Sequence, residues 1–209
     1  MPVDWAIGLI AYLGVAAGTV SGVMAARRKN MDAVGAVVVA FLTALGGGTL
    51  RDLLLGRGPV FWIREEGYAY LTLILAVAFF YSTRLLRFSA RSILIPDALG
   101  LGVFTVMGVE AGLADGTSWF IASLMGVITG VFGGVLRDIT CNELPALFSS
   151  DMYLYATCSL LGAWLYILTT RVGGMSALAL PLTVAFIVLL RLAAVRFNLS
   201  LPEPKHPWG

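Results

Sequence analysis

Long apolar segments separated by short clusters of charged residues run through almost the whole of this sequence. Hydrophobic residues make up 59% of the 209 positions and charged residues only 12%, whereas a soluble domain carries about a quarter charged residues. A helix needs roughly 20 apolar residues to cross a bilayer, and these segments are too continuously apolar for the alternating strands of a membrane barrel. The sequence therefore predicts an all-α membrane protein with seven transmembrane helices. They are expected over residues 5–26, 31–55, 68–84, 92–112, 118–141, 152–170 and 176–195.

The positions of Lys and Arg predict which way these helices run. The segment from Met1 to Trp5 has no basic region of the kind that opens a cleaved signal peptide, so the first apolar segment is expected to remain as a transmembrane helix. Connections on the cytoplasmic side of a membrane protein carry the excess of basic residues. One side here has Arg27, Arg28, Lys29, Arg84, Arg87, Arg91, Arg196 and Lys205, and the other has Arg57, Arg64 and Arg171. We therefore expect the N-terminus outside and a Pro-rich, unstructured cytoplasmic tail over residues 197–209.

The sequence also resembles itself. Residues 21–62 align without a gap on residues 107–148, an offset of 86 positions. The alignment brings together two charged motifs and then a proline seven residues beyond each aspartate, which is far more specific than a match of apolar residues. The motifs are Gly47-Gly48-Thr49-Leu50-Arg51-Asp52 and Gly133-Gly134-Val135-Leu136-Arg137-Asp138.

The repeat predicts how the chain is organised. The first unit, residues 1–91, and the second, residues 92–175, would each hold three transmembrane helices, followed by a seventh helix over residues 176–196. An odd number of crossings inverts the second unit relative to the first, which is typical of many transport proteins with a site between the units.

Consecutive glycines lie at matching points of the second and fifth predicted helices. Gly46, Gly47 and Gly48 have Gly133 and Gly134 as their counterparts. One interpretation is a helix break, which would leave backbone carbonyls free to bind an ion in a polar cavity. The other is close helix packing, which the four-residue spacing of further glycines also favours. These are Gly14, Gly18 and Gly22, and Gly126, Gly130 and Gly134.

Each glycine motif is followed by an arginine and an aspartate at membrane depth. Charges at this depth usually face the interior of the helix bundle and pair. Neighbouring residues on a helix point about 100° apart, so we predict that pairing crosses the repeat, Arg51 with Asp138 and Arg137 with Asp52. The alternative is that all four are hydrated at the membrane edge.

Other polar residues are less specific. Asp97 and Glu110 lie in the fourth predicted helix, where Asp97 either contributes to a pathway or only starts the helix. Arg191 in the seventh helix is expected to extend to the cytoplasmic surface. The sequence has no phosphate-binding glycine loop, and its single histidine, His206, lies in the tail. No enzyme, no cofactor, no stable metal site and, at a net charge of +2, no nucleic-acid partner is expected.

Two Gly-Gly-x-Leu-Arg-Asp elements in a seven-helix chain of this length resemble the bacterial branch of the trimeric intracellular cation (TRIC) channel family. Chains of this type are also described as a glycine-transporter-like domain family. The resemblance covers residues 5–195 and implies a homotrimer in the bacterial inner membrane, with a pore for K⁺ and Na⁺ in each protomer lined by kinked second and fifth helices. The candidate pathway residues are Gly46, Gly47, Gly48, Thr49, Arg51, Asp52, Asp97, Gly133, Gly134, Arg137 and Asp138.

Three functions remain open from the sequence. A passive channel for monovalent cations is the favoured prediction, because a cation path needs carbonyl, hydroxyl or carboxylate oxygens to replace lost hydration. A secondary transporter of a small solute such as glycine is the alternative, since inverted repeats suit that class equally well. The third, a membrane scaffold without transport, fits the buried charges least well.

Overall fold

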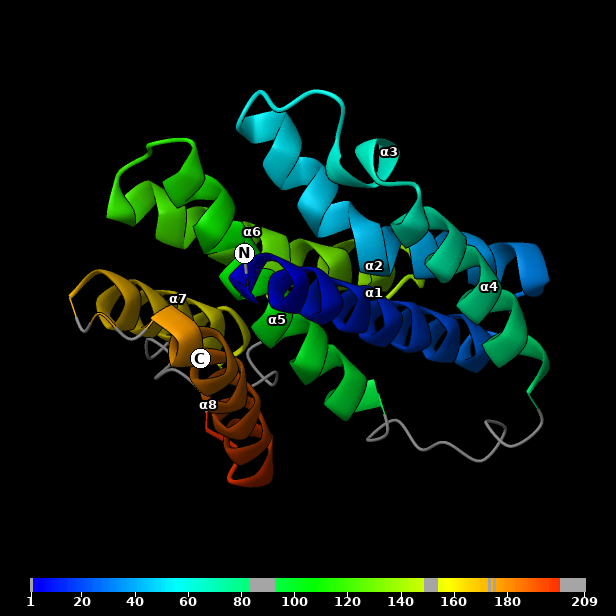
Figure 1. Cartoon of the computed structure of the whole chain (residues 1–209). Coiled ribbons are helices and arrows are strands. Elements are labelled where there is room, and N and C mark those ends of the chain that lie inside the picture. The colour runs from blue at the N-terminus through cyan, green and yellow to red at the C-terminus, as the bar shows by residue number, and fades with distance from the viewer. Residues whose placement is uncertain (1, 83–92, 149–153, 173, 175, 200–209) are drawn as a thin grey trace.

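The computed structural model describes residues 2–82, 93–148, 154–172, 174 and 176–199. Within these ranges the chain forms eight α-helices and no strand, so the predicted all-α class is confirmed. The helices are α1 (Pro2–Arg28), α2 (Ala33–Leu54), α3 (Phe61–Arg64), α4 (Gly67–Tyr81), α5 (Leu94–Ala114), α6 (Trp119–Thr140), α7 (Tyr155–Arg171) and α8 (Ser176–Arg196) (Figure 1).

Five of these helices, α1, α2, α5, α6 and α8, are long and apolar enough to cross a membrane. α4 is apolar but has only 15 residues, and α7 has 17. Each of the seven predicted segments coincides with one of the seven longer helices, and the short α3 was not predicted. The number of membrane crossings stays a prediction.

Some predictions concern residues outside the described ranges. They are the ends of segments at residues 84, 92 and 152, the basic residues Arg84, Arg87 and Arg91, and the tail from residue 200 onward.

The ends of α2 and α6 are built in the same way, 86 positions apart. Asp32 caps the start of α2 by accepting a hydrogen bond from the Gly35 amide, and Ser118 caps α6 by accepting one from the Ile121 amide. Two residues after the last position of each helix comes a residue with positive φ, 66° at Gly56 and 54° at Asn142, a conformation that glycine and asparagine tolerate. The sequence repeat is thus also a repeat of local structure at the ends of these two helices.

The core is built around α5 and α6. α6 packs against α2, α5 and α7, while α1 packs against α2, α4 and α5, and α8 covers α5 and α7. Much of this packing is between small residues: a Cβ on Gly22 would lie 2.7 Å from the Cα of Ala40, and one on Gly108 would lie 2.7 Å from the Cα of Gly126. Without a hydrophobic force between helices in lipid, such close approach supplies the attraction.

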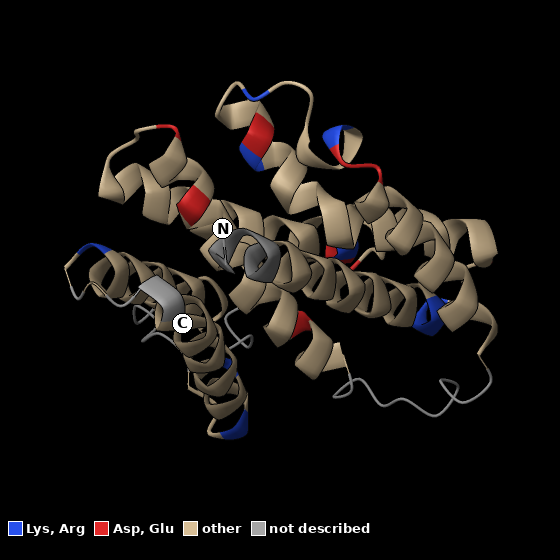
Figure 2. Cartoon of the chain, viewed as in Figure 1, with Lys and Arg blue, Asp and Glu red and all other residues tan. Residues whose placement is uncertain are grey.

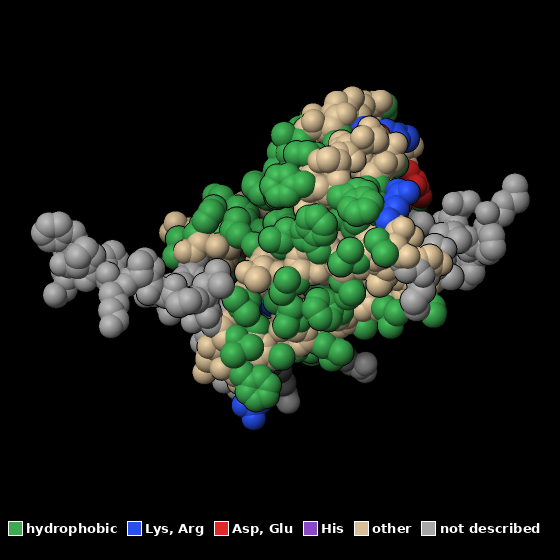
Figure 3. Space-filling view, turned by 90° about the vertical axis from the view of Figure 1, so that its left-hand side faces the viewer, with side chains coloured by type: hydrophobic (Ala, Val, Ile, Leu, Met, Phe, Trp, Pro, Cys, Tyr) green, Lys and Arg blue, Asp and Glu red, His purple; other side chains and the backbone are tan. Residues whose placement is uncertain are grey.

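The outer surface is apolar over large areas. Hydrophobic side chains are spread across the face seen in Figure 3, and α4 exposes Leu73, Ile74 and Val77 along one side. Charged residues lie mostly near helix ends (Figure 2). A surface of this kind is stable in lipid or against another protein and not in water.

Candidate functional site

α2 and α6 cross at glycines that have no room for a side chain. A Cβ on Gly47 would run into the carbonyl oxygen of Thr129, and a Cβ on Gly133 would run into that of Thr43. The contacts are reciprocal, because Thr129 and Gly133 lie 86 positions after Thr43 and Gly47. Since Thr43 meets Gly133 while Gly47 meets Thr129, the two helices run antiparallel at the crossing.

The glycines do not interrupt either helix. α2 is helical through residues 46–48 and α6 through residues 133–134. The predicted helix breaks with free carbonyls are therefore wrong, and the alternative interpretation, close packing, is correct. The physical reason is that two backbones in van der Waals contact have no space between them for an unpaired segment.

The other glycines of the motifs receive side chains from neighbouring elements. Gly46 faces the side chain of Leu136, the ring of Phe61 lies against Gly48, and the Tyr155 hydroxyl lies near Gly134. In each motif, the glycine one turn before the arginine therefore packs against an aromatic side chain from another segment.

Arg51 pairs with its own neighbour. Its Nε and Nη2 donate to Oδ1 of Asp52 at 2.8 and 2.6 Å, and its guanidinium lies 5.6 Å from the centre of the Phe61 ring. Both charged residues are buried, at 5% and 1% exposure. They are therefore not hydrated at the membrane edge.

Arg137 likewise donates from Nε to Oδ1 of Asp138 at 2.8 Å. The predicted pairs across the repeat, Arg51 with Asp138 and Arg137 with Asp52, are wrong. The 100° between neighbouring positions describes where side chains leave the helix, and an arginine is long enough to fold its planar guanidinium back onto the next carboxylate.

The second oxygen of each aspartate holds the chain that follows the helix. Oδ2 of Asp52 accepts from the Phe61 amide at 2.7 Å, and Oδ2 of Asp138 accepts from the Ala146 amide at 3.1 Å. A carboxylate with donors on both oxygens is satisfied although it is buried. Asp52 and Asp138 thus anchor the segments that follow α2 and α6.

Arg137 has partners that Arg51 lacks. Its Nη1 donates to Oδ1 of Asp97 at 2.6 Å and to Oγ of Ser21 at 2.6 Å. The counterpart of Asp97 in the first unit is Ala11, and the counterpart of Ser21 is Met107. Arg137 therefore joins α1, α5 and α6 and contacts two carboxylates, so the two halves of the site differ in charge.

Arg191 lies in the interior and not at the surface. It is 2% exposed, and its guanidinium lies 4.8 Å from the centre of the Tyr155 ring. The expected extension to the cytoplasmic surface is wrong, because a cation stacked on an aromatic ring is stabilised within the bundle. Sequence reasoning missed this ring, since a tyrosine at a predicted helix start carries no specific signal.

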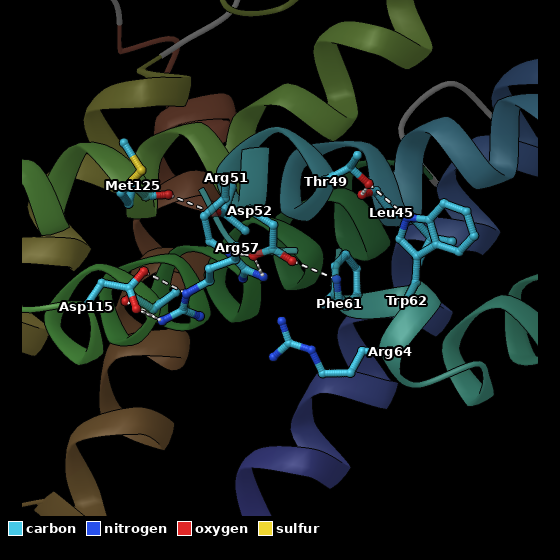
Figure 4. A network of polar contacts seen from close by, with 12 residues as sticks. Leu45, Thr49, Arg51, Asp52, Arg57, Phe61, Trp62, Arg64, Asp115 and Met125 are labelled. Atoms are coloured by element: carbon cyan, nitrogen blue, oxygen red, sulfur yellow. Dashed lines mark hydrogen bonds and ion pairs between the residues drawn. The ribbon is translucent and has the colours of Figure 1, made fainter. Parts of the chain in front are cut away.

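Two further ion pairs connect residues next to the ends of α2 with residues next to the ends of α6. Nε and Nη2 of Arg57 contact the two carboxylate oxygens of Asp115 at 2.7 Å each, and Nη2 also donates to the Ala111 carbonyl at 2.8 Å. Figure 4 shows this pair beside Arg51 and Asp52. At the opposite ends, Lys29 Nζ lies 2.9 Å from Oε1 of Glu143. Sequence reasoning missed both pairs.

The Arg57–Asp115 pair predicts a pH dependence. The guanidinium beside it holds the pKa of the Asp115 carboxyl below its usual range. A group whose pKa is lowered on folding stabilises the protein above its unfolded pKa of about 3.9, and this stabilisation is lost as the pH falls through the lower folded pKa. Thermal unfolding of the wild type and Asp115→Asn should therefore differ at neutral pH and converge in acid. A difference that does not change with pH would contradict this.

Thr49 and Trp62 connect α2 to α3. Trp62 Nε1 donates to the Thr49 hydroxyl at 2.9 Å, and that hydroxyl donates to the Leu45 carbonyl at 2.8 Å. Thr49 is thus engaged with protein partners. Trp62→Phe should lower the free energy of unfolding by about 1 kcal/mol, the usual net value of one hydrogen bond. Thermal unfolding in detergent tests this against Trp119→Phe, at an exposed position; an equal loss in both variants would argue against the bond.

Curated relatives share this chain over most of its length. A family model described as glycine transporter matches residues 9–84 and 94–171, so each matched stretch contains one Arg-Asp pair. The UPF0126 membrane protein of Vibrio cholerae is 40% identical over 195 residues, which cover 93% of this chain and 81% of that protein. The UPF0126 inner membrane protein YadS of Escherichia coli is 34% identical over 198 residues, covering 91% of this chain and 92% of that protein.

A solved structure gives the family a more specific name. The crystal structure of the TRIC trimeric intracellular cation channel orthologue from Rhodobacter sphaeroides matches with a TM-score of 0.85 and 38% identity, covering 93% of this chain and 99% of that one. This chain belongs to the TRIC family. The resemblance noted in the sequence is confirmed, and the TRIC relatives are membrane channel proteins and not enzymes.

Proposed function

We propose that this protein is a passive channel for monovalent cations, K⁺ and Na⁺. The observation that carries the proposal is the likeness over nearly the whole fold to the TRIC cation channel of Rhodobacter sphaeroides, at 38% identity. The likeness covers 93% of this chain and 99% of that structure.

The pathway is proposed to run between the two units, past the crossing of α2 and α6. Buried charge lies on both sides of this crossing, Arg51 with Asp52 on one and Arg137 with Asp97 and Asp138 on the other. Because Arg137 contacts two carboxylates, that end favours a cation more than the Arg51 end does. Carboxylate and hydroxyl oxygens are the groups that replace the hydration of a permeating cation.

The architecture is proposed to be an inverted repeat of seven transmembrane helices, with units at residues 1–91 and 92–175, followed by α8. The matching caps of α2 and α6 and their reciprocal antiparallel crossing support it. The basic residues Arg27, Arg28 and Lys29 at the end of α1 support an outside N-terminus and a cytoplasmic C-terminus. Alkaline phosphatase fused to the C-terminus should then be inactive.

We propose that three copies assemble, each with its own pathway. The apolar face of α4 is one surface able to bury against another copy, and the Rhodobacter relative is described as trimeric. Mass measurement of the detergent-solubilised protein should give three chains. A monomer that conducts would contradict the proposed trimer but not the proposed pathway within each copy.

Flux into vesicles separates channel from transporter. Vesicles containing the purified protein should dissipate a potassium gradient, with a rate that keeps rising as the gradient increases, and should not exchange labelled glycine. Saturable glycine counterflow without potassium flux would instead support the description of the family model as a glycine transporter. Empty vesicles and vesicles with heat-unfolded protein are the controls.

A further inference from the structure

The two ion pairs at the ends of α2 and α6 are related by the repeat. Asp115 lies 86 positions after Lys29, and Glu143 lies 86 positions after Arg57. Lys29 pairs with Glu143 and Arg57 pairs with Asp115, so each of the two basic residues bonds the repeat counterpart of the other basic residue. This is the same reciprocal relation that Thr43, Gly47, Thr129 and Gly133 show at the crossing, and in both pairs the base comes from the first unit.

The pairs lie at opposite ends of the same two helices. Lys29 precedes α2 and Glu143 follows α6, whereas Arg57 follows α2 and Asp115 precedes α6. Each helix has 22 residues and is therefore about 33 Å long. One ion pair thus fastens the two units at each end, and the glycine crossing lies between the two pairs.

The two pairs are not equally strong. Arg57 binds both oxygens of Asp115 and a backbone carbonyl of α5, a bidentate geometry that gives the stronger charge-assisted bonds. Among the described residues Lys29 makes one ion-pair contact, and its side chain and that of Glu143 are 34% and 39% exposed, against 25% and 31% for Arg57 and Asp115. Exposed pairs are also the ones that salt screens most.

We infer that Lys29–Glu143 is a latch that holds the pathway closed at its end of α2 and α6, while Arg57–Asp115 stays fastened as the anchor at the other end. The latch rests on the proposed channel function, because it controls the opening of that pathway. Breaking it allows the start of α2 and the end of α6 to separate, while the crossing and the Arg57–Asp115 pair keep their contacts. Higher ionic strength therefore favours the open state.

Open probability in planar bilayers tests the latch. Glu143→Gln and Lys29→Gln should each raise the ratio of open to closed time about twofold to fivefold, the effect of losing one exposed ion pair. The double variant should do no more than either single one, and the exchange Lys29→Glu with Glu143→Lys should return the ratio toward the wild type. Arg28→Gln is the matched control, since it removes the same charge next to Lys29 from an exposed residue.

A distance measurement tests the latch independently of conduction. Spin labels would be placed at Val34 and Ile139, which are 71% and 58% exposed and lie at the start of α2 and the end of α6, in a background without Cys141 and Cys158. Their separation should widen in Glu143→Gln, and in the wild type when an impermeant salt raises the ionic strength at constant potassium.

The possible failures are distinguishable. A wild-type protein that passes no current overturns the proposed channel. Currents or label distances that respond equally to Glu143→Gln and to Arg28→Gln, or to neither, overturn the latch and leave the channel proposal standing.

Discussion

Gly47→Ala should lower the free energy of unfolding by at least about 3 kcal/mol, the upper end of the usual cost of overpacking. The added methyl group meets the Thr129 carbonyl oxygen, which belongs to the backbone of α6 and cannot move without moving that helix. Gly133→Ala should cost a similar amount against the Thr43 carbonyl. Thermal unfolding in detergent, together with the yield of folded protein, measures both losses.

Gly100→Ala is the matched control for these substitutions. It also lies within a long helix, α5, but of the described residues a Cβ there would meet only Phe104, at 3.9 Å. Alanine favours a helix over glycine by about 1 kcal/mol, so this variant should be as stable as the wild type or more so. If Gly47→Ala behaves in the same way, the close crossing of α2 and α6 is wrong.

Arg137→Met should be the most damaging single change of charge. It leaves the carboxylates of Asp97 and Asp138 in the interior without their common partner, and breaking a buried ion pair on one side costs about 3–5 kcal/mol. Adding Asp97→Asn should recover part of the loss, because one of the two orphaned charges is then removed. The free energy of unfolding of the single and double variants gives the comparison.

Two variants bound the expected size of this effect. Arg51→Met leaves only Asp52 unpaired and should cost less than Arg137→Met. Arg64→Met removes an exposed arginine whose bond to the Pro59 carbonyl is 3.1 Å long and should cost almost nothing. An equal loss in the free energy of unfolding for Arg137→Met and Arg64→Met would show that Arg137 is not the partner that stabilises the buried carboxylates of Asp97 and Asp138.

The sequence predicted the fold better than the site. Seven apolar segments and the offset of 86 positions located the long helices, because lipid leaves the backbone few alternatives to a helix. α3 was missed, since four residues carry no periodicity, and it depends on the bond from the Phe61 amide to Asp52.

At the site, the sequence predicted which charged residues are buried but not which residues they pair with. All four charges of the Arg-Asp motifs are buried as expected, yet their pairing follows the reach of the arginine side chain, which spacing alone does not give. Asp97 was noted without its role, and only the fold brings it to Arg137 from 40 positions away. The ion pairs across the repeat were visible in principle, because the offset places Lys29 on Asp115 and Arg57 on Glu143, residues of opposite charge.

The most direct measurement of cation conduction is single-channel recording of the purified protein in a planar bilayer under a gradient of potassium chloride. We expect discrete current steps that reverse near the potassium equilibrium potential, with a smaller step in Asp97→Asn and an unchanged one in Glu66→Gln, which alters an exposed residue. A silent bilayer, or currents that reverse near the chloride potential, would contradict a cation channel.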